Sequence, residues 1–461
     1  MLSPTDRKKQ LQRDQRNYKK HLKEVERKNK FQKNSKRQEN EHRFRQNHQN
    51  RIFKSRKESF FQRYGVLITP ESGEEHIEIP ENFCLCTNYA TAFSTIKIFA
   101  SSIYDYLGSP LTLDFSKCKR ADTAALFLLQ IIRLEMIGIV EDLQERFPAL
   151  FLNPDIKVSL SKTPDVVRLL ITTGYPVDIE AFNQENREKV TMQPIDHMGF
   201  FRGNSKQQEY RENRKPVVAK KVVDYLNKCL DRYGYELRED DKNSTEGIIG
   251  EVLSNAEDHS SSDTWFITSN FSGDISEGTD KMVGELNIAI ANFGHSFYEA
   301  FESTKIKNHE QYNQVESLVQ RNREKNPTMK FGDEQLYTLV MMSETISRLK
   351  YKEDSRGTGT IKFLRSFGEL GDFENKANGY MPNLSLFTGH THLICDNELK
   401  PFAKDTVYCL SLNPEKDLTV PPRESHLKIL PEKFPGTLLS VKIYLNKQHL
   451  DKKYGGNQND N

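Results

Sequence analysis

The sequence predicts an α/β protein in which two successive α/β regions follow a basic amino-terminal arm. Strand-like and helical stretches alternate between residues 111 and 174, which is typical of a sheet covered by helices. A helical stretch at 247–260 and a strand-like one at 286–296 form a second alternation. Residues 1–65 hold 21 Lys and Arg against 7 Asp and Glu, whereas the rest of the 461 residues holds 46 against 58. This split indicates a separate basic arm on an acidic body.

The arm, residues 1–65, is expected to be helical or disordered, because so polar a segment needs a partner to become ordered. Two interpretations stay open. One is a solvated arm without a ligand, and the other is electrostatic capture of nucleic acid or of an acidic protein surface. Residues 66–80 are expected to form a linker, since Thr69–Glu75 is rich in turn-forming residues.

The first α/β region is expected over residues 81–200. A strand at Leu111–Phe115 leads through a polar turn into an apolar helical run that starts at Leu126. Lys157–Leu160 leads in the same way into a helix over 165–174. Repetition of strand, turn and helix is the pattern of a sheet built from βα units.

This first region resembles a STAS domain, the fold of anti-anti-sigma factors, over about residues 85–175. In phosphorylated STAS domains the acceptor is the second residue after the Asp of the strand–helix turn. Here Asp122 is followed by Thr123 and Ala124. The acceptor position that the resemblance implies is therefore Ala124, which has no hydroxyl group to phosphorylate.

The second region is expected over residues 217–445, after a basic segment (192–216) that the sequence predicts to be an interdomain loop. Polar residues 446–461, rich in Asn and Gly at their end, are expected to be a disordered tail. An amphipathic helix that begins after Pro216 would open the region.

The stretch around which the second region is organised is Gly247–Ser260. Its apolar residues recur at helical spacing and predict one buried face. Glu251, Asn255 and Asp258 stand at i, i+4 and i+7, so the helix places them together on the other face. An amide between two carboxylates suits Mg²⁺, which takes few protein oxygens and also binds phosphates.

Two later stretches complement this helix. Leu286–Ala291 alternates like a strand and breaks at Asn292 and Gly294. Further on, a Gly-x-Gly turn opens a helix, and backbone N–H groups at such a helix start can hold phosphate. Its candidate residues are Arg356, Gly357, Thr358, Gly359 and Thr360. A closing strand follows at 436–445 and includes Thr437.

In this order the stretches resemble the GHKL (Bergerat-fold) ATPases, which include gyrase, mismatch-repair, chaperone and histidine-kinase ATP domains and anti-sigma-factor kinases. The resemblance covers about residues 217–445 and implies an α/β sandwich that binds ATP and Mg²⁺. It implies Asn255 as the metal ligand and Glu251 as the catalytic base or water-orienting carboxylate. The nucleotide-binding residues it implies are Asn255, Asp258, Asn292, Gly294, Arg356, Gly357, Thr358, Gly359, Thr360 and Thr437.

The chain departs from the family at two positions of the second motif. The family's adenine-reading Asp is Asn292 here, and the last glycine of that motif is Ser296. Asparagine still accepts a hydrogen bond from an adenine amino group, but it brings no charge. The segment from Phe301 to Glu353 corresponds to the family's ATP lid.

The sequence thus predicts a cytoplasmic, Mg-dependent ATP-binding regulator, which can hydrolyse ATP and whose nucleotide state controls a protein partner. No run of eighteen apolar residues and no apolar signal core is present, and the six cysteines are scattered, so neither a membrane span nor secretion is expected. Three alternatives stay open: a Ser/Thr or His protein kinase, a nucleic-acid-linked ATPase that uses the arm, and a scaffold with a vestigial ATP site. The identity of the partner and the formation of a homodimer stay open too.

Overall fold

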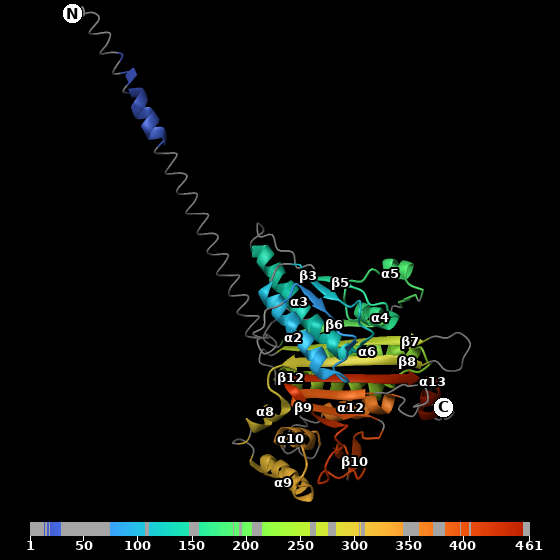
Figure 1. Cartoon of the computed structure of the whole chain (residues 1–461). Coiled ribbons are helices and arrows are strands. Elements are labelled where there is room, and N and C mark those ends of the chain that lie inside the picture. The colour runs from blue at the N-terminus through green and yellow to red at the C-terminus, as the bar shows by residue number, and fades with distance from the viewer. Residues whose placement is uncertain are drawn as a thin grey trace, which may run out of the picture. The chain divides into compact units, whose positions relative to one another are not determined.

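The structure is a computed structural model (Figure 1). It describes residues 13, 16–17, 19–28, 74–106, 110–146, 156–187, 189–192, 196–204, 214–258, 264–274, 283–303, 305, 309–343, 359–371, 383–396, 398–404 and 407–454. The chain divides into two compact units, residues 1–60 with 141–151 and residues 61–140 with 152–461. In the first unit the described residues 19–28 are helical and exposed. All strands of the described residues belong to the second unit.

The amino-terminal region is built on a small parallel sheet with helices, as the strand–helix alternation predicts. The strands β1 (His76–Glu78), β3 (Leu111–Asp114) and β5 (Ile156–Ser159) pair in that order, and β2 (Asn82–Phe83) pairs with β4 (Arg120–Ala121). The helices are α2 (Tyr89–Asp105), α3 (Thr123–Arg146), α4 (Pro164–Thr172) and α5 (Ile179–Glu185). Because β1 lies within 66–80, the linker prediction is wrong for His76–Glu78.

Asp122 caps the start of helix α3 through one backbone hydrogen bond and holds the segment before α2 through another. Asp122 Oδ1 accepts from the Ala125 N–H at 2.8 Å, and Oδ2 accepts from the Cys86 N–H at 3.0 Å. Burial raises the pKa of Asp122 despite these bonds. Ala124 is completely buried in the first turn of α3.

The carboxy-terminal region is built on a five-stranded antiparallel sheet with helices. Its strands, in spatial order, are β6 (His197–Asn204), β7 (Thr264–Asp274), β8 (Val283–Phe293), β12 (Leu427–Asn446) and β9 (Asn383–Cys395). The hairpin β10 (Phe402–Lys404) and β11 (Val407–Cys409) is separate. The helices are α6 (Lys215–Asp231), α7 (Glu239–Asp258), α8 (Phe297–Glu302), α9 (His309–Lys325), α10 (Asp333–Met341), α12 (Gly359–Leu370) and α13 (Lys447–Tyr454).

Helices α6, α7 and α12 cover one face of this sheet. Side chains alternate between the two faces of a strand, so Leu286, Ile288 and Ile290 of β8 share a face. They belong to one buried cluster together with Ile249 and Leu253 of α7. The apolar face predicted for residues 247–260 is therefore a core face.

The opposite face of the sheet carries an aromatic layer, which consists of Phe200, Phe266, Phe293, Phe387 and Phe434. Helix α2 packs on this layer: the ring of Tyr89 stacks on that of Phe387 at 5.9 Å, and the ring of Phe93 lies 6.0 Å from that of Phe434. Figure 1 shows α2 and α12 on opposite sides of the strands. The five-stranded sheet is therefore covered on both faces.

A short polar network joins the amino-terminal region to the same face. Asn270 of β7 donates to the hydroxyl of Thr123 at 3.2 Å and accepts from Asn287 at 3.1 Å. Asn270 and Asn287 are both buried. Hydrogen bonding of these buried amides removes most of the cost of placing them in the core.

Two other predictions about the ends of the carboxy-terminal region are wrong. The loop predicted at 192–216 contains edge strand β6, whose Gly203 lies under the indole ring of Trp265; a Cβ at Gly203 would lie 2.0 Å from the ring. The first predicted region, 81–200, therefore ends inside a strand of the second sheet. The tail predicted at 446–461 begins with the last residue of β12 and with α13. Residues 455–461 lie outside the described residues.

The described part of the segment likened to an ATP lid is packed into the core. Val315 and Val319 of α9 are completely buried. Asn322 of α9 donates to the carbonyls of Leu418 and Val420, at 3.1 and 2.9 Å. These contacts fix α9 to the loop before β12. Helix α9 is therefore packed as part of the folded core of the carboxy-terminal region.

One described helix, Thr123–Glu145, is long and apolar enough to cross a membrane by length and composition. Of its most apolar window, 78% is buried inside the structure, which is what a core helix shows, so the helix is weak evidence either way. All six cysteines are free thiols.

Candidate functional site

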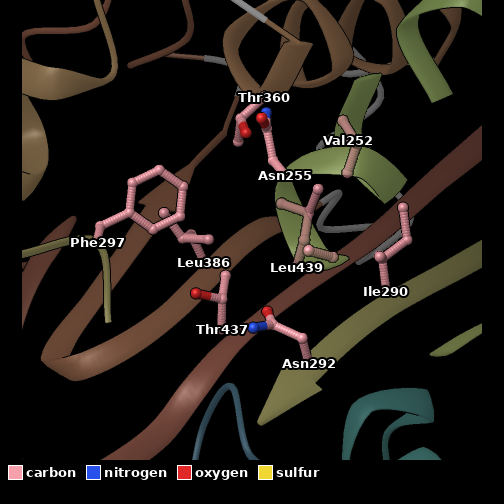
Figure 2. A pocket seen from close by; sticks show the side chains of 10 residues that line it. Val252, Asn255, Ile290, Asn292, Phe297, Thr360, Leu386, Thr437 and Leu439 are labelled. Atoms are coloured by element: carbon pink, nitrogen blue, oxygen red, sulfur yellow. The ribbon is translucent and has the colours of Figure 1, made fainter. Parts of the chain in front are cut away.

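A pocket lies between helices α7 and α12 and the five-stranded sheet (Figure 2). Residues of α7, α8, α12 and three neighbouring strands line it, and none of them is charged. The lining residues are Val252, Asn255, Ala256, Ile290, Asn292, Phe297, Thr360, Leu386, Thr437 and Leu439.

The floor of the pocket follows from strand alternation and register. Ile290 and Asn292 are two residues apart on β8, and Thr437 and Leu439 are two apart on β12, so each pair shares a face. Asn292 is the register partner of Thr437, and Thr437 is in turn the partner of Thr388 on β9. A polar row therefore crosses the sheet at one end of the pocket.

The buried amide of Asn292 is the most unusual group in this row. Its side chain is 1% exposed, and within the described residues neither Oδ1 nor Nδ2 has a hydrogen-bond partner. Figure 2 shows the amide turned toward Thr437 at the bottom of the pocket. An unpaired buried amide costs about 1–3 kcal/mol, so a ligand that pairs with it gains that amount.

A bulge in β12 shapes this end of the pocket. The register between β12 and β9 shifts between Phe434 and Thr437. Gly436 has φ +131°, and a Cβ there would lie 2.2 Å from the carbonyl oxygen of Asn292. Only glycine fits, because the neighbouring atom is backbone and cannot move aside.

The wall beside the polar row is the start of α8. Ser296 caps this helix: its hydroxyl accepts from the Glu299 N–H at 3.1 Å, and Glu299 Oε2 accepts from the Ser296 N–H at 2.9 Å. Burial alone would raise the pKa of Glu299, but Lys433 and the Ser296 N–H lower it overall. The Phe297 N–H donates to the hydroxyl of Thr388 at 2.9 Å, which fixes the Phe297 ring over the pocket.

The other end of the pocket is formed by α7 and α12, which pack on each other. Figure 2 shows Asn255 and Thr360 there, away from Asn292 and Thr437. Thr360 is the second residue of α12, so it lies at the positive end of that helix. The pocket thus has two polar ends separated by apolar side chains.

Glu251 lies beside the start of α12 without lining the pocket. A Cβ added to Gly359 would come within 2.8–2.9 Å of the Cβ, Cγ and Cδ atoms of Glu251. A methyl group at Gly359 would therefore meet the side chain of Glu251. Gly359 therefore sets how closely the α12 start approaches the Glu251 side chain.

The remaining predicted residues are distributed as follows. Asp258 is exposed at the end of α7 and does not line the pocket. Gly294 donates its N–H to the Pro435 carbonyl at 3.3 Å, beside the bulge. Arg356, Gly357 and Thr358 lie outside the described residues.

The described residues offer few metal ligands at the pocket. They contain no group of three or more His, Cys, Asp or Glu side chains that could hold a metal ion. At the end formed by α7 and α12, the side-chain oxygens are those of Asn255 and Thr360 and, beside the start of α12, those of Glu251. Such a small set suits Mg²⁺ bound mainly through the phosphates of a ligand.

Several pocket residues were not found from the sequence, among them Phe297, Leu386 and Leu439. Leu384, Leu386 and Thr388 stand two residues apart in β9, so they share one face of the strand. This spacing is the sequence pattern that places Leu386 on the same face as Thr388. The Ser-x-x-Glu spacing of Ser296 and Glu299 likewise predicts a helix start.

We compared the chain with protein-family models, with curated proteins and with solved structures, and none of the three comparisons gave a match.

Proposed function

We propose that the carboxy-terminal region binds a nucleoside triphosphate, of which ATP is the representative, together with Mg²⁺ in the pocket between α7, α12 and the sheet. The observation that carries the proposal is the buried Asn292 amide, whose two polar atoms have no partner within the described residues. The edge of a nucleobase presents a hydrogen-bond donor and a hydrogen-bond acceptor, which can pair with the oxygen and the nitrogen of such an amide. This proposal extends to a GHKL-type fold for the region and to a STAS-like fold for the region before it.

The two polar ends of the pocket fit the two ends of a nucleotide. The base would lie over Ile290, Leu386 and Leu439 on the face of the sheet, with its edge toward Asn292 and Thr437. The phosphates would lie toward Thr360, at the start of the twelve-residue helix α12, where backbone N–H groups and the helix dipole favour an anion.

Asn255 and Glu251 have distinct roles in this proposal. The amide oxygen of Asn255 would hold the cation, and bound Mg²⁺ neutralises phosphate charge. Glu251, beside Gly359, would orient a water molecule and accept its proton during hydrolysis. We also propose a regulatory role, in which the nucleotide state controls contacts with a protein partner. Strands β8 and β12 support it, because they carry the pocket on one face and the aromatic layer on the other.

The proposal is tested by calorimetric titration of the full chain with ATP in the presence and absence of Mg²⁺. We expect saturable binding that Mg²⁺ strengthens, and loss of the Mg²⁺ effect in Asn255→Ala. The matched control is Asn243→Ala, an exposed position on the same helix, which should bind as the unchanged protein does.

Absence of nucleotide binding to the folded full chain would refute the proposal. Equal Mg²⁺ dependence in Asn255→Ala and in the unchanged protein would remove Asn255 as a metal ligand and leave nucleotide binding standing.

A further inference from the structure

We infer that Asn292 lets the pocket accept purines with either an amino or an oxo group at position 6. This inference rests on the proposed function and concerns which base the site takes. It starts from the absence, within the described residues, of any hydrogen-bond partner for Asn292 Oδ1 and Nδ2.

The orientation of an asparagine amide is ordinarily fixed by its neighbours. A donor opposite Oδ1 or an acceptor opposite Nδ2 makes one of the two flipped arrangements much better than the other. The described surroundings of Asn292 provide neither, since the adjacent pocket residues are the apolar Ile290 and the hydroxyl-bearing Thr437. A hydroxyl both donates and accepts, so Thr437 accommodates both arrangements.

Each arrangement matches one kind of purine edge. Adenine presents a 6-amino donor beside the N1 acceptor, so Oδ1 accepts from the amino group while Nδ2 donates to N1. A 6-oxopurine presents the O6 acceptor beside the N1–H donor, and the flipped amide pairs with both. The same side chain therefore satisfies either edge with two hydrogen bonds.

A carboxylate at this position could not do the same. It only accepts hydrogen bonds, so it would pair with one group of either edge, the 6-amino group or the N1–H group, and would be repelled by the lone pair of the other group, N1 or O6. No charged side chain among the described lining residues offsets that repulsion. Of the two side chains, only the amide therefore makes two hydrogen bonds with either edge.

The experiment measures the dissociation constants of Mg·ATP and Mg·inosine triphosphate for the full chain. Inosine triphosphate is the suitable probe because it differs from ATP only along the edge that faces Asn292. We expect the two constants to agree within about fivefold in the unchanged protein. In Asn292→Asp, both nucleotides should lose about 10- to 100-fold in affinity, the range for an unsatisfied buried group.

A preference above about tenfold for ATP in the unchanged protein would overturn this inference and leave the proposed function intact. Failure to bind either nucleotide would refute the proposed function itself. If Asn292→Asp does not fold, the comparison in the unchanged protein still decides the question. If that variant folds and binds both nucleotides as tightly as the unchanged protein does, the edge of the base does not face residue 292 and the inference is wrong.

Discussion

The carboxyl group of Glu251 is held where two helices meet, and its contact with Gly359 ties its position to the start of α12. Glu251→Gln keeps the size of the side chain but cannot take a proton. If the chain hydrolyses ATP, we expect turnover to fall about 10²–10⁴-fold with little change in ATP affinity.

Phosphate release by the purified variant, alongside calorimetric ATP binding, measures both quantities. Glu246→Gln on the same helix is the control and should leave turnover unchanged. Unaltered turnover in Glu251→Gln would show that Glu251 is not the base.

A second residue-scale prediction concerns His392 of β9, which is stacked on the ring of Phe387 and accepts from or donates to the hydroxyl of Ser385 at 3.1 Å. Burial, with a smaller contribution from Lys428, lowers the pKa of His392 from 6.5 to about 3. The folded state therefore holds His392 neutral where the unfolded state binds a proton. The contribution of the neutral His392 ring to the stability of the folded state is complete above pH 6.5 and is lost as the pH falls toward 3.

We expect the free energy of unfolding to fall by about 1.4 kcal/mol per pH unit below pH 6.5 through this group. His392→Gln should lack this part of the slope, since glutamine does not titrate. Urea unfolding of both proteins at several pH values between 5 and 8 measures the difference. Parallel curves would mean that His392 is protonated in the folded state.

At the scale of the element, the bulge in β12 decides the shape of the pocket floor. Gly436→Ala would force a Cβ to within 2.2 Å of the Asn292 carbonyl, at a φ of +131° that disfavours any other residue. We expect a loss of about 2–4 kcal/mol in the free energy of unfolding and, if the pocket binds nucleotide, weaker binding.

The matched control is Gly247→Ala in α7, where a Cβ meets nothing within 4 Å. That change should stabilise the protein by about 0.5–1 kcal/mol, because alanine is the better helix former. Thermal or urea unfolding of the two variants tests the pair. Equal effects would show that the bulge tolerates a side chain.

The elements also show what the sequence could and could not reveal. The helical periodicity at 247–260 predicts α7 well, because its apolar spacing is long and regular. Strand β6 was missed because its burial is mostly intermediate, so its residues show no clear alternation. Its identity as a strand comes from pairing with β7, which is a tertiary contact that local sequence does not encode.

The same reasoning applies to the pocket. Asn255, Asn292, Thr360 and Thr437 are candidates because they stand in short stretches that resemble those of the GHKL family, and in the structure they line one pocket. Leu386 and Phe297 were missed, since an apolar residue acquires its place in a pocket only from its neighbours in space. The contact between Gly359 and Glu251 was missed for the same reason.

At the scale of the whole molecule, the covering of the sheet on both faces makes the two α/β regions depend on each other. A shortened chain of residues 196–454 would lack α2 and would leave Phe387 and Phe434 in water. We expect this fragment to aggregate or to bind an apolar dye that the full chain does not bind.

Light scattering and dye fluorescence of the purified fragment measure this outcome. A monomeric fragment with a cooperative melting transition would show instead that the carboxy-terminal region folds independently of α2.

The packing of Trp265 on Gly203 has an optical consequence. Trp265 is the chain's single tryptophan, is 1% exposed, and lies on the outermost strand pair of the large sheet. Its emission spectrum therefore reports on one location, the docking of β6 along β7, without any label. A shift to longer wavelength would mark the detachment of that edge even while the rest of the fold persisted, so a simple fluorimeter can follow this edge of the large sheet in real time.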